Sequence, residues 1–305
     1  MSERITNSMV TGSTLNDLNA SLGALDRSSE EMSSGRTILE PSDNPYGASR
    51  VIDLQSQLDG LSSYATNAQE GISWETTSSS AMSNMSSVVE RVRELLVQAS
   101  NGTYSQSDRN SIGTEVEQLT ETVKQDANTQ YGGQYVFAGT ATNTPPYEQG
   151  AEDAYQGNSG TIMRAIGPAA SVTINTNISS LLGNGQGSGG DGKLLDTLRT
   201  IAEHLKGGTT EDVAALGSSD LKSLEANAET LSGLEATAGS VTDQLQMATS
   251  RIEGLQSSIT ASLSNTEDVN IAKVSIEYSS QQASYEAALR AGATIIQESL
   301  LNFLQ

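Results

Sequence analysis

Cysteine is absent from the sequence, histidine occurs once, and aromatic residues make up only 4% of the chain. Without cysteine there can be no disulfide, no thiol nucleophile and no thiolate-bound zinc. The single histidine, His204, forms neither an H-x-x-x-H nor an E-x-x-H pattern with its neighbours, so we expect it to be a surface or packing residue. The scarcity of aromatic side chains argues against a large compact core but suits long helices that pack through Leu, Ile, Val and Ala.

Basic residues are also few, with 16 Lys and Arg against 37 Asp and Glu, which leaves a net charge of −21. Nucleic acids and anionic membranes attract basic surfaces, so we expect neither as a partner. The sequence has no apolar run of about 18 residues that could cross a bilayer, and we expect no membrane insertion. Residues 1–10 show neither the apolar stretch nor the cleavage site of an ordinary secretory signal, so we expect no such signal.

Heptad periodicity is the strongest positive feature of the sequence. Apolar residues across 231–263 recur at alternating steps of three and four, which predicts a coiled-coil helix. The same spacing across 51–99 predicts a second long helix, with the Ser-Thr cluster at 76–80 as the expected position of any break. We expect these helices to pack antiparallel, with a helix at 107–128 completing the bundle. The predicted seam consists of Val51, Leu54, Leu58, Leu61, Val92, Leu96, Leu231, Val241, Leu245, Ile252, Leu255 and Ile259.

Shorter amphipathic helices are predicted near the two ends, one at 1–32 and one after a turn at 264–268, with apolar seams at 15–32 and 289–303. They can pair with each other, but two short helices bury little apolar surface. We therefore expect them to be loose in the monomer and to become ordered on assembly. The predicted assembly interface consists of Leu15, Leu18, Leu22, Leu25, Leu289, Ile296, Leu300 and Phe303.

The middle of the chain differs in composition from the two helical arms. It contains Pro145-Pro146, repeated glycines and short β-branched runs, and it ends in a Gly-rich tether at 183–192. A G-x-G-x-x-G pattern at 185–190 lies in that tether without a surrounding βαβ unit, so we expect no dinucleotide site. No catalytic, cofactor-binding or metal-binding residues are predicted anywhere in the chain, and no cofactor is expected.

These observations predict a mainly α fold: an elongated antiparallel coiled-coil bundle formed by the N- and C-terminal arms, with a small β-rich domain inserted in the middle. The predicted parts are an N-terminal assembly helix and connector, the first half of the bundle with a terminal strand near 134–139, the insertion with its tether, the second half of the bundle, and a C-terminal assembly helix. Their ranges are 1–45, 46–139, 140–192, 193–264 and 265–305.

Several motifs in the two arms are more specific than a generic coiled coil. Residues 4–7 (Arg-Ile-Thr-Asn), 33–45, 67–72 and 93–102 resemble the N-terminal arm of the flagellin superfamily. Two further stretches are more similar to its hook–filament junction (hook-associated protein) branch. They are the Gly-Gln-Tyr-Val-Phe-Ala-Gly-Thr run at 133–140, followed by Pro-Pro-Tyr, and the tail at 284–304.

The resemblance implies an extracellular structural protein of the bacterial flagellum that is not an enzyme. Family members are exported unfolded through the flagellar type III apparatus, without a cleaved signal peptide. The implied partners are the first hook–filament junction protein (FlgK), flagellin, further copies of the chain in a ring, and a flagellar export chaperone (FlgN) before export. The terminal helices would form an inner coiled-coil tube, with the bundle around it and the insertion facing outward.

Two other functions remain open from the sequence. The chain could be flagellin, the main filament subunit, which shares this architecture and would be distinguished by its abundance in sheared filaments. It could instead be a secreted adhesin or an enzyme that acts through the insertion at 140–192. So short a segment with few apolar residues is poorly suited to holding a catalytic site on its own, and a ligand- or glycan-binding assay on the insertion would test this alternative.

Overall fold

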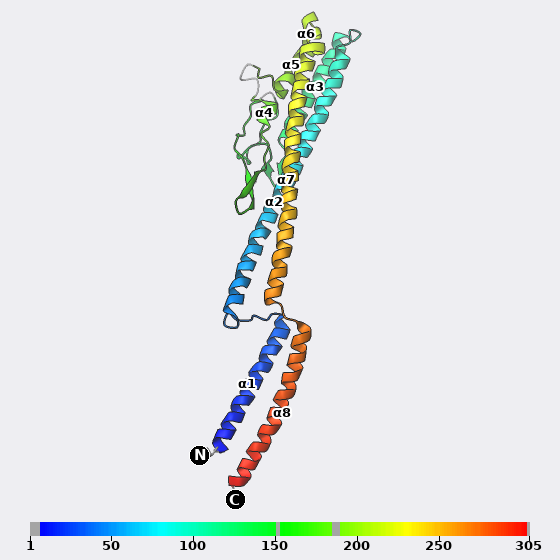
Figure 1. Ribbon diagram of the computed structural model, residues 1–305. Helices are drawn as coiled ribbons and strands as arrows, with labels where there is room; N and C mark the ends of the chain where they lie inside the picture. The colour runs from blue at the N-terminus through cyan, green and yellow to red at the C-terminus, as the bar shows by residue number, and fades with distance from the viewer. Residues whose placement is uncertain (1–6, 151–152, 185–189, 304–305) are drawn as a thin grey trace. The chain divides into compact units, whose positions relative to one another are not determined.

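The computed structural model describes residues 7–150, 153–184 and 190–303, without the side chains of residues 7, 8, 10 and 295–303 (Figure 1). The chain is mainly helical and divides into two compact units, Met1–Gly60 with Leu255–Gln305, and Leu61–Gly254. Two long helices, α2 (Pro45–Ala99) and α7 (Leu221–Glu267), contribute residues to both units. This confirms the predicted mainly α fold class with its small β content.

The first unit contains a pair of helices, α1 (Asn7–Ser34) and α8 (Ile271–Phe303), which lie side by side (Figure 1). Ser28 of α1 donates a hydrogen bond to the side-chain carbonyl of Gln281, whereas Thr14 lies next to Gly292. Later residues of α1 therefore meet earlier residues of α8, and the two helices run antiparallel.

Helices α7 and α8 meet close to Glu267, and the last helix begins at Ile271, within the predicted C-terminal part at 265–305. The predicted turn at 264–268 is helical as far as Glu267. Thr266 donates its hydroxyl hydrogen bond to the carbonyl of Ser262 at 2.7 Å, and Ser264 donates to Asp268 at 2.5 Å. Because these polar side chains bond within the helix instead of competing with it, the polar run does not break the helix.

The connector after α1 is hydrogen-bonded to the connector between α7 and α8 within the first unit. The amide of Thr37 donates to the carbonyl of Glu267 at 2.7 Å, and the amide of Val269 donates to the carbonyl of Gly35 at 2.9 Å. Arg36 adds an ion pair with the largely buried Glu267 at 2.7 Å. These contacts form a short antiparallel ladder, called the connector ladder below.

The second unit is a helical bundle built from residues 61–99 of α2, α3 (Gln106–Ala127), α5 (Leu194–Gly207) and residues 221–254 of α7. Gly71 of α2 packs against Leu245, whereas Arg93, later in α2, pairs with Glu225, earlier in α7, at 3.5 Å. Helices α2 and α7 are therefore antiparallel here, as predicted. A short helix, α6 (Thr210–Ala215), and a π-helical turn, η2 (Leu216–Asp220), lead into α7.

Helix α2 continues without a break through the Ser-Thr cluster at 76–80, where an interruption was expected. Thr76 donates to the carbonyl of Ile72 at 2.7 Å, and Ser80 donates to that of Thr76 at 2.8 Å. The hydroxyls are therefore satisfied by the helix itself.

Helix α3 begins at Gln106, one residue earlier than predicted, and its N-cap is Ser105. The Ser105 hydroxyl accepts from the amide of Asp108 while the Asp108 side chain accepts from the amide of Ser105. This reciprocal capping box satisfies two amides that the helix leaves unpaired.

The middle of the chain contains two small antiparallel hairpins and one helical turn. Strands β1 (Gln130–Tyr131) and β2 (Gln134–Tyr135) pair through residues 130 and 135, and β3 (Met163–Gly167) pairs with β4 (Ala170–Thr173). A single turn, α4 (Ser179–Leu182), follows. The strand expected at 134–139 is only two residues long, because Val136, Phe137 and Ala138 instead insert fully into the core.

The residues of the insertion share one hydrophobic core with the bundle. Fully buried side chains from residues 147–182 belong to the same cluster as Met82 and Met85 of α2, Leu198 of α5 and Leu245 of α7. They are Tyr147, Ile174, Ile178, Leu181 and Leu182. The segment is thus packed into the second unit.

Candidate assembly surface

The facing stripes of α1 and α8 follow a three-and-four spacing. Leu18 and Leu25 of α1 are half-buried, and Ser28 is buried. On α8 the less exposed positions with the same spacing are Val274, Tyr278, Gln281, Tyr285, Ala288 and Gly292. Each helix therefore turns one stripe toward the other, and that stripe contains small and polar residues as well as apolar ones.

A second set of apolar side chains on these helices remains exposed. Leu15 and Leu22 of α1 are 52% and 38% exposed, and Leu289 of α8 is 44% exposed. An apolar stripe wider than one coiled-coil seam leaves such residues available after the two helices have paired.

The predicted interface residues are thus divided between the two stripes. Leu18 and Leu25 lie at the pairing stripe, whereas Leu15, Leu22 and Leu289 lie outside it. The side chains of the other three predicted residues, Ile296, Leu300 and Phe303, lie outside the described residues. On α8 the pairing stripe passes through Ala288 instead of Leu289, one position away from the predicted seam.

Two exposed apolar residues of α8 were missed from the sequence. Ile271 and Ile276 are 51% and 71% exposed. They precede the apolar seam predicted at 289–303 and do not share its heptad spacing. The seam therefore carried no signal for them.

The predicted bundle seam is largely buried. Seven of its residues are buried, while Leu58, Leu61, Val241 and Ile259 are half-buried. The buried ones are Val51, Leu54, Val92, Leu96, Leu231, Leu245 and Ile252.

Leu255 departs from the predicted seam, because it is 47% exposed while its neighbour Gln256 is half-buried. From Ile252 the less exposed positions continue at 256 and 259. A straight α-helix advances 3.6 residues per turn, which moves the inward position from 255 to 256. Leu255 is therefore an exposed residue of the first unit and not part of the seam.

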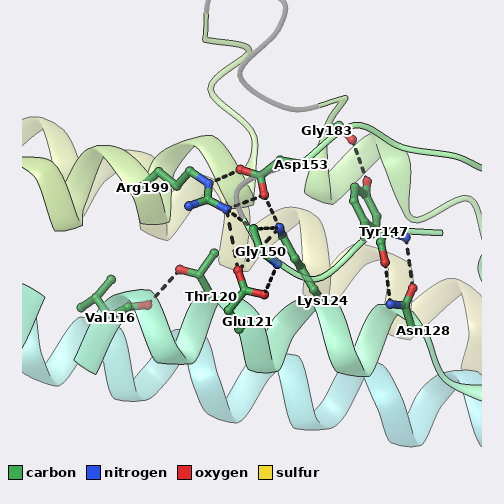
Figure 2. A network of polar contacts seen from close by, with 10 residues as sticks. All are labelled: Val116, Thr120, Glu121, Lys124, Asn128, Tyr147, Gly150, Asp153, Gly183 and Arg199. Carbon is green, nitrogen blue, oxygen red and sulfur yellow. Dashed lines mark hydrogen bonds and ion pairs between the residues drawn. The ribbon is translucent and has the colours of Figure 1, made fainter. Parts of the chain in front are cut away.

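A polar network fastens the loop around residue 150 to the helices of the second unit (Figure 2). Lys124 of α3 is fully buried, and its Nζ lies 2.5 Å from Oδ1 of Asp153 and donates to the carbonyl of Gly150 at 2.6 Å. Arg199 of α5 contacts both carboxylate oxygens of Asp153, and its Nη2 donates to the same Gly150 carbonyl at 3.0 Å. Glu121 accepts the Gly150 amide hydrogen bond at 2.8 Å.

The charge of Asp153 is stabilised by this network. Burial alone would raise the pKa of the carboxyl group, but the hydrogen bonds and positive charges of Arg199 and Lys124 outweigh burial and hold that pKa below its usual range. Removing one member of a buried ion pair leaves the other charge uncompensated. No local spacing predicts this network, because its members come from two helices and a loop.

A second set of hydrogen bonds holds Tyr147 next to this network (Figure 2). The side chain of Asn128 donates to the carbonyl of Tyr147 at 2.6 Å and accepts from its amide at 3.0 Å. The Tyr147 hydroxyl donates to the carbonyl of Gly183 at 2.6 Å. The start and the end of the insertion are therefore linked through one buried tyrosine.

The single histidine of the sequence is paired with an acidic side chain. His204 lies with Nδ1 2.7 Å from Oδ2 of Asp220, in a pair that joins α5 to η2. Among the described residues, no group of three or more His, Asp or Glu side chains is arranged to hold a metal ion. Nor does that part of the chain contain a helix with the length and apolar character needed to span a bilayer.

Comparison with known proteins relates this fold to flagellar proteins. Residues 5–142 match the family model described as the bacterial flagellin N-terminal helical region. Flagellar hook-associated protein 3 of Escherichia coli (strain K12) is 33% identical over 149 residues, covering 48% of this chain and 46% of that protein. The chain thus spans about half the length of this relative.

Two further proteins resemble the chain over a greater length. Flagellin of Bacillus subtilis (strain 168) is 27% identical over 282 residues, which are 90% of each chain. The crystal structure of Bacillus cereus FlgL superposes with a TM-score of 0.58 at 18% identity, covering 70% of this chain and 99% of that one. At this identity the likeness establishes a common fold. The chain therefore resembles the N-terminal helical region of bacterial flagellin over residues 5–142 and shares its fold with FlgL.

Proposed function

We propose that the chain is a structural subunit of the bacterial flagellum that joins the hook to the filament. The observation that carries this proposal is the exposed apolar stripe of Leu15, Leu22 and Leu289 on the paired helices α1 and α8. In a chain with a hook-associated fold, this stripe is the surface that neighbouring copies would cover. A helical assembly needs two different complementary faces on each subunit, and two paired helices can supply them.

The proposed partners are further copies of the chain, FlgK on the hook side and flagellin on the filament side. We further propose export through the flagellar type III apparatus, with the chaperone FlgN holding the chain beforehand, and a location outside the cell. The protein would act as a non-enzymatic structural element. The resemblance to structural flagellar proteins supports this last point.

Flagellin is the second candidate, because the Bacillus subtilis flagellin aligns with 90% of this chain and the chain with 90% of it. The adhesin alternative has less support, since the insertion shares its core with the bundle instead of forming a separate body.

Electron microscopy of a strain that lacks the protein would test the proposal. Hooks without filaments are expected if the chain forms the junction. Complete filaments of normal length would contradict that role. Flagellin would be indicated instead if the chain were the dominant protein of sheared wild-type filaments.

A further inference from the structure

A buried carboxyl group lies between the insertion and the bundle. Glu75 of α2 is only 1% exposed, and its Oε2 makes no hydrogen bond within the described structure. It lines a cavity of about 270 Å³ in the second unit. The other walls come from residues 173–180, which include the end of β4 and the start of α4, and from residues 234–241 of α7.

Three polar side chains in the cavity wall, those of Asn175, Ser180 and Thr237, make hydrogen bonds to other groups. The side chain of Asn175 accepts from the amide of Ile162 and donates to the carbonyl of Gly160. Thr237 donates its hydroxyl to the carbonyl of Gly233, and Ser180 donates to that of Asn177. These donors are therefore not available to stabilise a carboxylate at position 75.

No neighbouring cation compensates the carboxyl group either. Glu75 is the only ionisable residue among the described residues that line the cavity. On α7, Glu235 and Asp243 line separate grooves with other residues of α2. From the insertion, Arg164 pairs instead with Glu70 at 3.5 Å.

We propose that Glu75 is a proton-dependent latch that holds residues 173–182 against α2 and α7. The protonated carboxylic acid is compatible with burial at a site where Oε2 has no hydrogen-bond partner, whereas the ionised form favours full hydration, which the open segment provides. Opening of the segment lets water reach the carboxylate. This inference is independent of the flagellar role.

The direction of the pH effect follows from the two states of the latch. Burial raises the pKa of Glu75 to about 8 in the closed state, against an ordinary value of 4.5 when the segment is open and hydrated. Between these values the open state releases a proton that the closed state retains. Opening should therefore become about tenfold more favourable with each pH unit from about 5 to 8. Above about pH 8 the effect should level off, because Glu75 is then ionised in both states.

Amide hydrogen exchange on the full-length protein tests the latch. The reporters are the amides of Ile174 and Leu182, which donate to the carbonyls of Ile162 and Ile178 at 2.9 Å. After correction for intrinsic exchange, their protection should fall about tenfold per pH unit between pH 5.5 and 7.5. Amides of α3 serve as the internal reference. Protection that stays constant relative to α3 would overturn the proposal.

Two substitutions at position 75 distinguish the effect of the Glu75 carboxyl group from a general effect of pH on the charge of the protein. Glu75→Gln should keep the segment protected at every pH, and Glu75→Met, which replaces the carboxyl group by an apolar side chain of similar size, should do the same. The control is Glu253→Gln, an exposed position of α7, which should behave like the wild type. A persistent fall in protection in Glu75→Gln, or failure of both Glu75 variants to fold, would show that the carboxyl group is not a latch.

Discussion

Gly71 of α2 faces Leu245 of α7 so closely that a β-carbon at position 71 would lie 3.0 Å from Cδ1 of the leucine. The leucine is fully buried and belongs to the main hydrophobic cluster. The glycine allows the helices to approach where the insertion also touches them, since Ile174 lies 3.1 Å from the same hypothetical β-carbon. This is the point in the second unit where α2, α7 and the insertion meet.

Leu245→Asp should therefore destabilise the second unit strongly. The substitution removes a buried side chain and places an unpaired charge in the seam, which should lower the free energy of unfolding by at least about 3 kcal/mol. Denaturant unfolding followed by circular dichroism measures the change. Met247→Asp, at a position that is 67% exposed two residues away, should change stability by less than about 0.5 kcal/mol. Equal effects of the two substitutions would place Leu245 outside the core.

Gly208→Ala should destabilise the end of α5. Gly208 has a φ of +74°, and an added β-carbon would lie 2.6 Å from the side chain of Gln106, whose amide group bonds to the carbonyl of Leu205. The expected loss is about 1–2 kcal/mol from the left-handed backbone alone. Gly233→Ala in the interior of α7, where a β-carbon would meet nothing within 4 Å, should instead gain about 0.5–1 kcal/mol. Thermal melting of the two variants should thus show shifts of opposite sign.

Asp153→Asn should weaken the attachment of the insertion at neutral pH. The substitution leaves Lys124 buried without its closest anion, and breaking such a buried pair costs about 3–5 kcal/mol. Glu117→Gln, which breaks an exposed pair with Lys206 at 2.6 Å, should cost about 0–1 kcal/mol. If urea unfolding showed comparable losses of stability for the two variants, burial of the Lys124–Asp153–Arg199 network would have no special effect.

The same carboxyl group should make the wild type sensitive to acid. The folded pKa of Asp153 lies below the ordinary value of 3.8, so its stabilising contribution is present above that value and is lost as the pH falls through the lower folded pKa. Unfolding measured from pH 5 down to pH 2 should therefore show a steeper loss in the wild type than in Asp153→Asn. Parallel pH profiles would contradict this assignment.

The exposed stripe should be required for assembly but not for folding. Leu15→Glu with Leu22→Glu places charges on side chains that lie outside the α1–α8 pairing stripe, so thermal unfolding of the isolated protein should change little. Filament attachment, scored by electron microscopy and swimming, should be lost because the apolar surface between copies is interrupted. Asn16→Glu with Asn19→Glu adds the same charge at exposed positions of α1 and should swim normally. Normal swimming of the leucine variant would show that the exposed stripe is not part of the interface between copies.

Deletion of residues 290–305 should separate folding from assembly in a second way. The hydrophobic cluster described above lies within residues 68–248, so the truncated chain should stay soluble and keep a cooperative unfolding transition. It should fail to join a growing flagellum because one of the paired terminal helices is shortened. A truncated strain that swims normally would refute the proposed role of this helix.

Long helices were accessible from the sequence because their signal is local and repeated. The heptads at 51–99 and 231–263 predicted α2 and α7 and their antiparallel packing, and the fold class is confirmed. Polar residues at 264–268 were wrongly taken as a turn as far as Glu267, and those at 76–80, the expected position of any break, also lie within a continuous helix. There the hydroxyl groups bond to carbonyls of their own helix, a choice that composition alone does not reveal.

The contacts of the insertion were not accessible in the same way. Lys124, Asp153 and Arg199 come from three separate segments, so their meeting depends on the tertiary structure and leaves no spacing in the sequence. The few apolar residues of 140–192 suggested that this segment could hardly hold a catalytic site on its own, yet Tyr147 and Ile174 are completely buried. A short segment with few apolar residues can pack tightly when several of them enter an existing core.

The connector ladder joins the segment after α1 to the segment between α7 and α8 within the first unit. Because Thr37 and Val269 donate across it in opposite directions, neither α1 nor α8 can be displaced at this end without shearing bonds to the other connector. A twisting load on one terminal helix is therefore shared with the second before it reaches either long helix. In a rotating filament, the connector ladder would therefore pass torque to α1 and α8 together, so that neither helix would bend alone.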